Sequence, residues 1–501
     1  MSVYDDYQGD RVGWFFGLRG PQLALLAVAC LPVFGAISAA RWWAALGLAA
    51  CWAVLVLLVI VPIRGRSATG WAVSVAASIN GGALGWTVFR SKAASGRVTD
   101  PLEPDLPGAL RAISTHEGPA QGHAYKRVAL IQNHAARTWA LTAAVVHPGI
   151  GMSGPDQRAR LGAAEAELID LANRTELIDE LIFMVRTVPE DGAERDQWVA
   201  RHRTTAGPDL ARQVNDDLQA GLTRASVRTQ AFFTFVVPEA RIAGPAKEVG
   251  RGLEGRARVL YSLAHELEAQ LRGSLGMSRV SWLSSPQLAA ACRTGFAPAD
   301  RASIVDALAA QRSDPGVNAD VPWCLAGPSG ADPVMRHYSH DAWNSVCAAI
   351  VLPDRGALMG ALAPVLTPEQ PGERRCVMVS YPIVGQAKAD RASRNGEFAA
   401  DTAESLRQRL GIKARARSRE QGVKARAMDG KLARGHSMIR PYAIATVTVP
   451  KTARISQYAR GLDSSIRRAG FAPQRLDIAH DAGFAASVIP LGLSLTRRST
   501  P

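Results

Sequence analysis

The sequence predicts an α+β protein in which an N-terminal two-helix transmembrane hairpin precedes cytoplasmic mixed α/β domains. Two observations predict this class. The run from Pro21 to Ile63 carries one charged residue, Arg41, and from about Val98 onward β-branched runs alternate with segments of helical period. The chain has 501 residues, of which 47% are apolar. It is therefore long enough for about two or three folded units and too apolar to be disordered.

The hairpin is predicted from the way in which the apolar run divides at Arg41. Its halves, Pro21–Ala40 and Trp42–Ile63, are apolar on every side, whereas a helix on the surface of a soluble protein shows a polar stripe. As a helix, each half can cross ~30 Å of hydrocarbon. The acidic start of the chain does not fit a cleaved signal peptide, which begins with basic residues.

The basic residues predict the orientation of this hairpin. Arg11 and Arg19 precede it, five basic residues follow between Arg64 and Arg97, and the turn holds Arg41 alone. Both ends are therefore expected in the cytoplasm, which makes the chain a multi-pass plasma-membrane protein. Trp71–Phe89 is also uncharged, but its polar and glycine residues favour an interfacial helix over a third span. A third span would place the large domain outside the cell.

The soluble part is expected to begin with a β-hairpin and to continue as sheets covered by helices. The predicted regions are a cytoplasmic tail (1–20), the hairpin (21–63), a basic juxtamembrane segment (64–97) and two α+β regions (98–367 and 368–501). Strands are expected at Tyr125–Gln132, Thr138–Val146, Leu181–Val188, Val227–Val237, Asn344–Leu352, Arg375–Tyr381, Tyr442–Val449 and Phe484–Leu493. Helices are expected at Gln157–Asn173, Asp209–Leu222, Lys247–Gly273, Gly356–Leu366, Gln386–Leu410 and Ile455–Ala469. No sequence repeat of fixed period is present, which disfavours a solenoid.

Composition and motifs argue against several classes of function. The six cysteines are scattered without a CxxC pair, as in a protein with reduced thiols, and the aromatic content of 6% does not favour base stacking. The only Gly-Lys pair, Gly430-Lys431, has Ala425 where a P-loop needs its first glycine and Leu432 where it needs a hydroxyl. No catalytic motif of the nucleophile-elbow, zinc-protease or EF-hand type is present. The sequence thus predicts neither an enzyme nor a bound cofactor.

One short segment concentrates groups that could do chemistry. His337-Tyr338-Ser339-His340-Asp341 holds two imidazoles and a carboxylate, which is typical of a metal or acid–base site. Zinc usually takes three or four ligands, and no other close His or Cys pair is present. The favoured interpretation is a polar loop in which Asp341 makes a turn before the next strand.

A basic stretch runs from residue 388 to residue 434. It holds thirteen Lys and Arg and six Asp and Glu, which accounts for half of the chain's net charge of +14. Its candidate partners are anionic lipid headgroups, the DNA backbone or an acidic protein, and a solvated basic connection is the alternative. The residues of its densest part are Lys413, Arg415, Arg417, Arg419, Lys424 and Arg426.

Several short motifs, taken together with the apolar hairpin, carry a family resemblance. They are Gly65-Arg66-Ser67, Phe89-Arg90-Ser91, Ala326-Gly327-Pro328, His337–Asp341, Pro353–Leu358 and Phe484–Leu493. In this order they resemble a family of actinobacterial integral membrane proteins encoded in conjugation-like, type IV secretion-related clusters. The layout is also similar to the small inner-membrane subunit of type IV secretion machines fused to the domain that precedes the motor of their large ATPase. The chain stops where the P-loop domain of that ATPase would begin.

The resemblance implies a non-catalytic platform subunit that is oligomeric within a complex and works with a separate motor ATPase and other secretion subunits. It supplies no catalytic residue. Two alternatives stay open: a membrane component of type VII secretion, and a membrane-bound metal-dependent enzyme that uses His337–Asp341.

Overall fold

The computed structural model describes residues 20–60, 87–391 and 427–495, apart from gaps at 122–125, 152, 190, 204–205, 226, 353–355 and 371, together with a few positions near residue 3 and between 62 and 85. The chain forms two compact units. Unit 1 consists of Met1–Asp5, Val88–Ala392 and Asp429–Pro501, and unit 2 consists of Asp6–Thr87 and Ser393–Met428.

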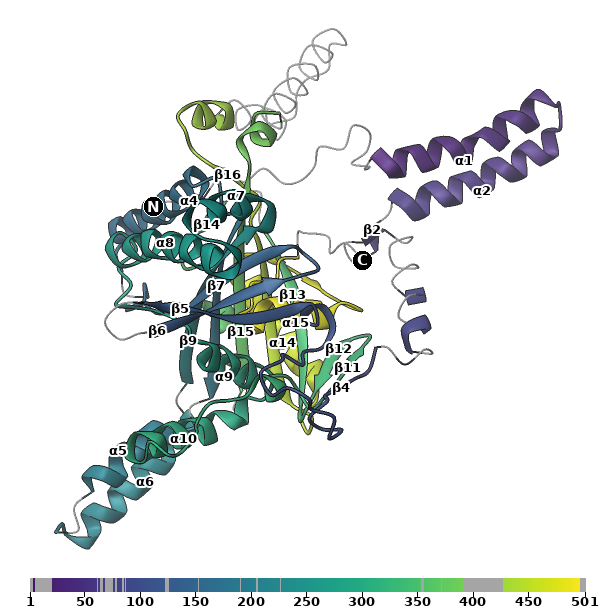
Figure 1. Ribbon diagram of the computed structural model, residues 1–501. Coiled ribbons are helices and arrows are strands. Elements are labelled where there is room, and N and C mark those ends of the chain that lie inside the picture. Colours follow the sequence, from purple (N-terminus) through teal and green to yellow (C-terminus); the bar gives the residue numbers. More distant parts are fainter. Residues whose placement is uncertain are drawn as a thin grey trace. The chain divides into compact units, whose positions relative to one another are not determined.

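Unit 2 contains the two helices that the apolar run predicts, α1 (Gly20–Ser38) and α2 (Trp42–Ile60), packed side by side (Figure 1). A short turn joins them, and the indole N–H of Trp52 donates a hydrogen bond of 3.0 Å to the carbonyl of Leu26. Large apolar side chains point away from the pair, and Trp43 is 90% exposed. Within the described residues, no helix has both the length and the apolarity that a membrane crossing requires.

Unit 1 is built on one large antiparallel sheet covered by helices, which confirms the mixed α and β character of this region (Figure 1). The order along the sheet is β4-β11-β12-β13-β17-β15-β8-β9-β7-β6-β5, and β10, β16 and β18 pair beside this path. The strands are β4 (Phe89–Arg90), β5 (Ile113–Gln121), β6 (Lys126–Asn133), β7 (Thr138–Val146), β8 (Glu180–Pro189), β9 (Val227–Pro238), β10 (Arg279–Trp282), β11 (Gly330–Val334), β12 (His337–His340), β13 (Trp343–Val351), β15 (Arg374–Val384), β16 (Met438–Ile439), β17 (Tyr442–Pro450) and β18 (Ala472–Arg475).

The sheet consists of two halves with the same topology, so unit 1 is an internal duplication. The first half has the order β5-β6-β7-β9-β8 and the second β11-β12-β13-β17-β15, and β8 pairs with β15 at the centre. The side strands correspond too, since β10 pairs with β7 and β18 pairs with β13. Met184 lies opposite Met378 in the central pair, where the two halves meet.

Corresponding strands share sequence as well as position. When β9 and β17 are aligned at their last residues, Pro238 and Pro450, the segments VRTQAFFTFVVP and IRPYAIATVTVP match at five of twelve positions. The last five residues of β7 and β13, TAAVV and CAAIV, match at three. The insertions between strands differ in length, which is why the chain shows no repeat of fixed period.

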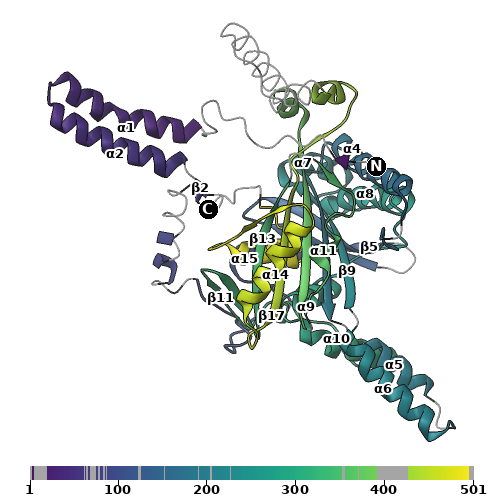
Figure 2. The same cartoon turned by 180° about the vertical axis from the view of Figure 1, so that it is seen from behind.

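The helices also occupy corresponding places in the two halves. On one face of the sheet, α9 (Ser285–Phe296) follows β10 and α15 (His480–Val488) follows β18, and both pack into one core with Ile182, Met184 and Met378. On the other face, α4 (Pro155–Arg174), α7 (Glu239–Val249) and α8 (Gly252–Gly273) cover the first half. The short α11 (Ala363–Leu366) and α14 (Ile455–Arg468) cover the second half (Figure 2).

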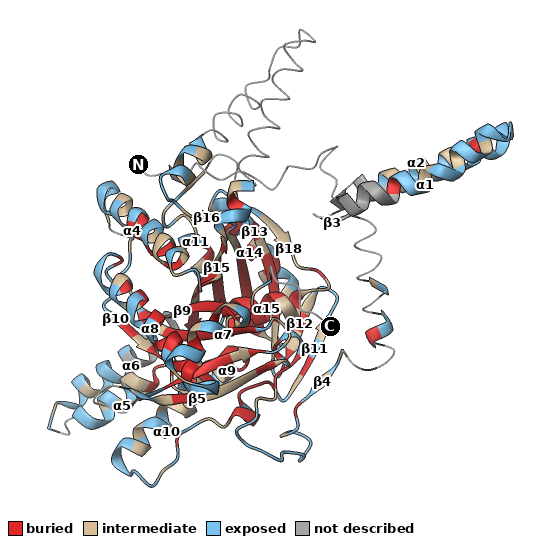
Figure 3. Cartoon of the chain, turned by 45° about the horizontal axis from the view of Figure 1, so that its top comes forward, coloured by how far each residue is buried: buried red, intermediate tan, exposed pale blue. Residues whose placement is uncertain are grey.

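The central strands are the most completely buried part of unit 1, because helices cover both faces (Figure 3). Alternate residues of β8 therefore serve different cores: Leu181 packs with α4 and α8, whereas Ile182 packs with α9 and α15.

Most of the predicted strands and helices are present, and three predictions are wrong. Phe484–Leu493 is not a strand, because α15 occupies residues 480–488. Gly356–Leu366 is a short strand β14 (Ala357–Leu358) and the single turn of α11 instead of one helix. Lys247–Gly273 is divided at Gly250 between α7 and α8. Most of Gln386–Leu410 and nearly half of Trp71–Phe89 lie outside the described residues.

The boundary expected at residue 368 does not separate two folded units. Strands β8 and β15, which come from the two predicted regions, are neighbours in one sheet and in one compact unit. The duplication instead divides the chain after α10 (Arg301–Ser313) and before β11.

Candidate functional site

The segment His337–Asp341 is strand β12 and its turn, so the polar loop that was expected is part of the sheet. β12 pairs with β11 on one side and with β13 on the other. Asp341 makes the turn into β13, as expected, with a positive φ of 44°. Its carboxylate accepts hydrogen bonds from the backbone N–H of Ser329 (2.6 Å) and from the guanidinium of Arg293 on α9 (3.1 Å).

His340 is fully buried, and both of its ring nitrogens have partners inside the protein. Nδ1 lies 2.9 Å from the carbonyl oxygen of Phe296, and Nε2 lies 2.8 Å from Oγ of Ser345. A carbonyl can only accept, so Nδ1 carries the proton and Nε2 accepts from Ser345. Burial lowers the pKa of His340 well below its usual value, and the charge of Arg374 adds to this effect. The imidazole is therefore neutral and already bonded on both sides, which does not suit a metal ligand.

The hydrogen bonds of His340 continue through a row of hydroxyl groups on the face of the sheet that α9 and α15 cover. Oγ of Ser345 lies 2.7 Å from Oγ1 of Thr448, and Arg374 reaches the same threonine at 3.4 Å. The row thus ends at a cation on one side and at the carbonyl of Phe296 on the other. Such a chain of bonds fixes every rotamer in it.

Two fully buried arginines on this face, Arg186 and Arg374, hold the C-terminal ends of both helices. Arg186 donates to the carbonyls of Ala291 in α9 (3.0 Å) and Val488 in α15 (3.1 Å). Arg374 donates to the carbonyls of Thr294 (2.8 Å) and Gly295 (2.5 Å) in α9. A cation at a helix C-terminus is favourable because the last carbonyls carry partial negative charge. Burial lowers the pKa of Arg186 to about 10.

The two halves also share a polar pair below these helices. Oγ1 of Thr142 lies 2.8 Å from Oγ1 of Thr234 in the first half. At the corresponding place in the second half, Oγ1 of Thr446 lies 3.1 Å from Sγ of Cys347. Burial raises the pKa of the Cys347 thiol, so this group stays protonated.

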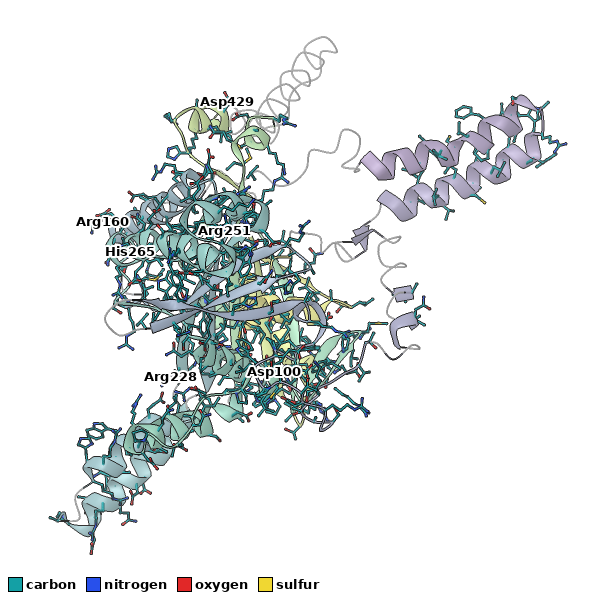
Figure 4. All side chains as sticks on the ribbon, viewed as in Figure 1. Asp100, Arg160, Arg228, Arg251, His265 and Asp429 are labelled. Carbon is teal, nitrogen blue, oxygen red and sulfur yellow. The ribbon has the colours of Figure 1, made fainter. Side chains whose placement is uncertain are left out.

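A helical hairpin extends beyond the end of the sheet between β8 and β9 (Figure 1). It consists of α5 (Ala193–His202) and α6 (Asp209–Ala225), and α10 lies beside its base. The guanidinium of Arg301 on α10 bonds both carboxylate oxygens of Asp191 (2.5 and 2.7 Å) and one oxygen of Glu194 (2.5 Å). Arg228, which Figure 4 labels at this base, pairs with Glu194 at 2.8 Å.

The outer part of this hairpin exposes apolar side chains. Leu210, Val214 and Leu218 recur every four residues on α6 and are 71%, 56% and 58% exposed. Residues four apart share one side of a helix, so the three form a stripe. The amphipathic pattern of Asp209–Leu222 could have revealed it, but the sequence alone could not show that the apolar side lacks a neighbour.

The insertion between β15 and β17 corresponds to this hairpin in the second half. Its described ends lie against α4, where the carboxylate of Asp170 accepts from the N–H of Ser437 (2.8 Å) and lies 3.1 Å from Nδ1 of His436. A cavity of about 20 Å³ beside them, lined in part by Asn173 and Gln386, has room for about one water molecule. The six basic candidates of the sequence, Lys413, Arg415, Arg417, Arg419, Lys424 and Arg426, lie outside the described residues.

The fold and these sites define a duplicated antiparallel-sheet protein in which His340, Arg186 and Arg374 bond to other buried groups and in which the exposed candidate site is a helical hairpin. No protein-family model matches the chain, and no curated protein matches its sequence. Among the described residues, no group of three or more His, Cys, Asp and Glu side chains could hold a metal ion.

Proposed function

We propose that the chain is a membrane-anchored, non-catalytic platform subunit of a conjugation-type transfer apparatus and that it works with a separate motor ATPase. The observation that carries the proposal is the outward apolar surface of α1 and α2. Val28, Leu31 and Phe34 on α1 are each more than 60% exposed, as are Trp43 and Leu46 on α2. Such a surface needs an apolar environment, and we assign that role to lipid.

Unit 1 supports the platform role through its surfaces. Several polar groups of the face below α9 and α15 make internal bonds, such as those of His340, Arg186 and Arg374. The α5–α6 hairpin, by contrast, presents exposed side chains for a macromolecule. The resemblance to actinobacterial conjugation-like proteins adds the type of apparatus to this argument.

The proposed topology places both termini and unit 1 in the cytoplasm. Reporter fusions after Arg97 and at the C-terminus test it, since both should give cytoplasmic activity. Activity typical of the outside of the cell from either fusion would contradict this topology. A fusion in the turn at Arg41 is the positive control, because it should report the opposite side.

The working partner is tested separately. The full chain, solubilised in detergent, should co-purify with a separate conjugation-type motor ATPase from its own cell and should show no ATP hydrolysis of its own. Turnover of ATP that follows this chain through purification would contradict the non-catalytic role.

The candidate basic contacts are tested by neutralising Lys413, Arg415, Arg417 and Arg419. This change should reduce co-purification with the motor ATPase if the partner of these residues is an acidic protein. If co-purification is unchanged and only the retention of duplex DNA falls, the partner of these residues is the phosphate backbone of DNA.

A further inference from the structure

Helix α14 (Ile455–Arg468) has one buried side and one exposed side, and no exposed residue within 455–468 is acidic or apolar. On the buried side, Ala459, Leu462 and Ile466 recur at helical spacing and pack into the core of the second half. Each exposed residue can donate a hydrogen bond, and three of them are cations. The exposed residues are Ser456, Gln457, Arg460, Ser464, Arg467 and Arg468.

Two further cations extend this basic side at the start of the helix. Lys451 and Arg454 directly precede α14 and are exposed as well. From Arg454 to Arg468 the helix rises by about 21 Å, at 1.5 Å per residue. We call the five cations the α14 patch: Lys451, Arg454, Arg460, Arg467 and Arg468.

The protein balances only part of the charge of the α14 patch. Among the described residues, the first three members of the patch form no ion pair. Arg467 lies 3.9 Å from Asp463, and its side chain is 59% exposed. Arg468 pairs with Glu369, and its side chain is 60% exposed. The patch therefore keeps an excess of positive charge at the surface of unit 1.

The helix in the corresponding place of the first half has no such excess. α14 joins β17 to β18, and α7 and α8 join β9 to β10. On α8, Arg258 pairs with Glu254 and Arg272 pairs with Glu268, in each case over four residues. Both helices cover the same sheet, so the basic side of α14 is not a requirement of the fold. A contact with an external anion accounts for it.

The side chains of α14 indicate which anion it binds. Arginines and lysines together with serine and glutamine are typical contacts of the phosphate oxygens in a nucleic-acid backbone. A helix that inserts into a membrane surface exposes apolar residues beside its cations, and a stable protein interface has an apolar core. The exposed residues of 455–468 provide neither, and they include no aromatic ring on which unpaired bases can stack. A duplex therefore fits better than a bilayer, a protein or a single strand.

We infer that the α14 patch binds the phosphate backbone of duplex DNA without reading its sequence. Duplex DNA carries one negative charge per ~1.7 Å of its axis, so a rigid helix with cations along ~21 Å meets several phosphates at once. The inference goes beyond the proposed function and does not depend on it, because it requires neither a membrane anchor nor a motor ATPase.

The full chain in neutral detergent micelles tests this inference with a fluorescently labelled duplex of mixed sequence, whose binding is followed by anisotropy. Binding by the wild type should weaken steeply as salt is added. Changing Lys451, Arg454 and Arg460 together to Gln should raise the dissociation constant at about 0.1 M salt at least about tenfold. The slope of log K against log salt should also fall by about 0.9 for each phosphate contact that is lost. These side chains are exposed, so the circular dichroism spectrum should not change.

A control with the same loss of charge changes Arg160 on α4, labelled in Figure 4, and Arg258 and Arg272 on α8 to Gln. All three are exposed, and affinity and slope should stay close to those of the wild type. Arg454→Lys with Arg460→Lys keeps the charge and should keep the slope.

Three results would overturn the inference. The first is a wild type that does not bind the duplex, or a Gln variant that binds it as the wild type does. The second is tighter binding of a single strand than of the duplex. The third is a Gln variant that loses only its binding to anionic vesicles, which would identify lipid as the partner of the patch.

Discussion

At the scale of single residues, the buried cations Arg186 and Arg374 distinguish the face below α9 and α15. Among the described residues, they bond to helix carbonyls and to the polar side chains of Gln230 and Thr448. Burying a charge costs free energy, and hydrogen bonds to a charged group offset that cost. These arginines should therefore stabilise the fold only while the carbonyls of both helices stay in place.

The first prediction concerns Arg186. Arg186→Met removes bonds to two buried carbonyls and to Gln230 but also removes a buried charge, so the free energy of unfolding should fall by about 2 kcal/mol. Arg186→Lys keeps the charge and loses the planar fork, so it should destabilise at least as much. Chemical denaturation measures both. Arg160→Met, at an exposed site on α4, should change the value by less than about 0.5 kcal/mol. A Lys variant as stable as the wild type would contradict this account.

The second prediction follows from the neutral state of His340. Its folded pKa is lowered below 6.5 by burial, so the unfolded chain takes up a proton before the folded chain does. The stability that depends on this group is fully present above pH 6.5 and should be lost as the pH falls below it. The measurement is the free energy of unfolding between pH 8 and pH 5.

His340→Gln should flatten that acid dependence, because glutamine does not titrate. His265, exposed on α8 and labelled in Figure 4, provides the matched control, and His265→Gln should leave the slope unchanged. Equal slopes for the wild type and His340→Gln would show that other groups set the acid sensitivity.

At the scale of helices and strands, the sequence predicted elements with a clear period and missed those without one. The strands at Thr138–Val146 and Val227–Val237 agree with β7 and β9 within a residue, because their β-branched and apolar runs are long. α15 was missed because nearly every residue from Phe484 to Leu493 is buried. A helix that is buried all round has no polar stripe to reveal its period.

The break between α7 and α8 brings the first turn of α8 against the end of α7, which the sequence analysis did not predict. A Cβ on Gly255 would lie 2.2 Å from the carbonyl oxygen of Ala246 and 2.5 Å from that of Gly250. The two helices meet at this glycine so closely that no side chain fits. The candidate site on α6 was only partly predictable. Its amphipathic pattern is in the sequence, but the exposure of its apolar side depends on contacts far along the chain.

The third prediction concerns the base of the α5–α6 hairpin. Arg301→Met removes the cation that faces Asp191 and Glu194, so the two carboxylates repel each other and α5 should detach locally from α10. Hydrogen exchange of the α5 amides should become faster, while that of β8 and β9 stays slow. Arg201→Met, on the exposed end of α5, is the control. Unchanged exchange in α5 after Arg301→Met would mean that other contacts hold the hairpin.

At the scale of the whole molecule, the duplication could not be read from the sequence. The corresponding strands keep only short matches, such as Thr234 with Thr446 and Pro238 with Pro450, and insertions of different length separate them. Pairing of β8 with β15 also joins residues far apart in the chain, which local patterns do not report. The boundary expected at residue 368 lies between strands that the structure joins in one sheet.

The fourth prediction tests whether the two halves are units that recognise each other. A chain divided in the loop at Gly316, between α10 and β11, should yield two fragments, 1–315 and 316–501, that co-purify when they are expressed together. The central pair of strands joins them, and each half bonds the other: Arg186 reaches Val488, and Arg374 reaches Gly295. Met184→Asp places a charge in the buried centre, at 3% exposure, and should abolish co-purification. Met335→Asp, at an exposed position, should preserve it. Fragments that fold but never associate, with Met184 intact, would show that the halves need the covalent link to find each other.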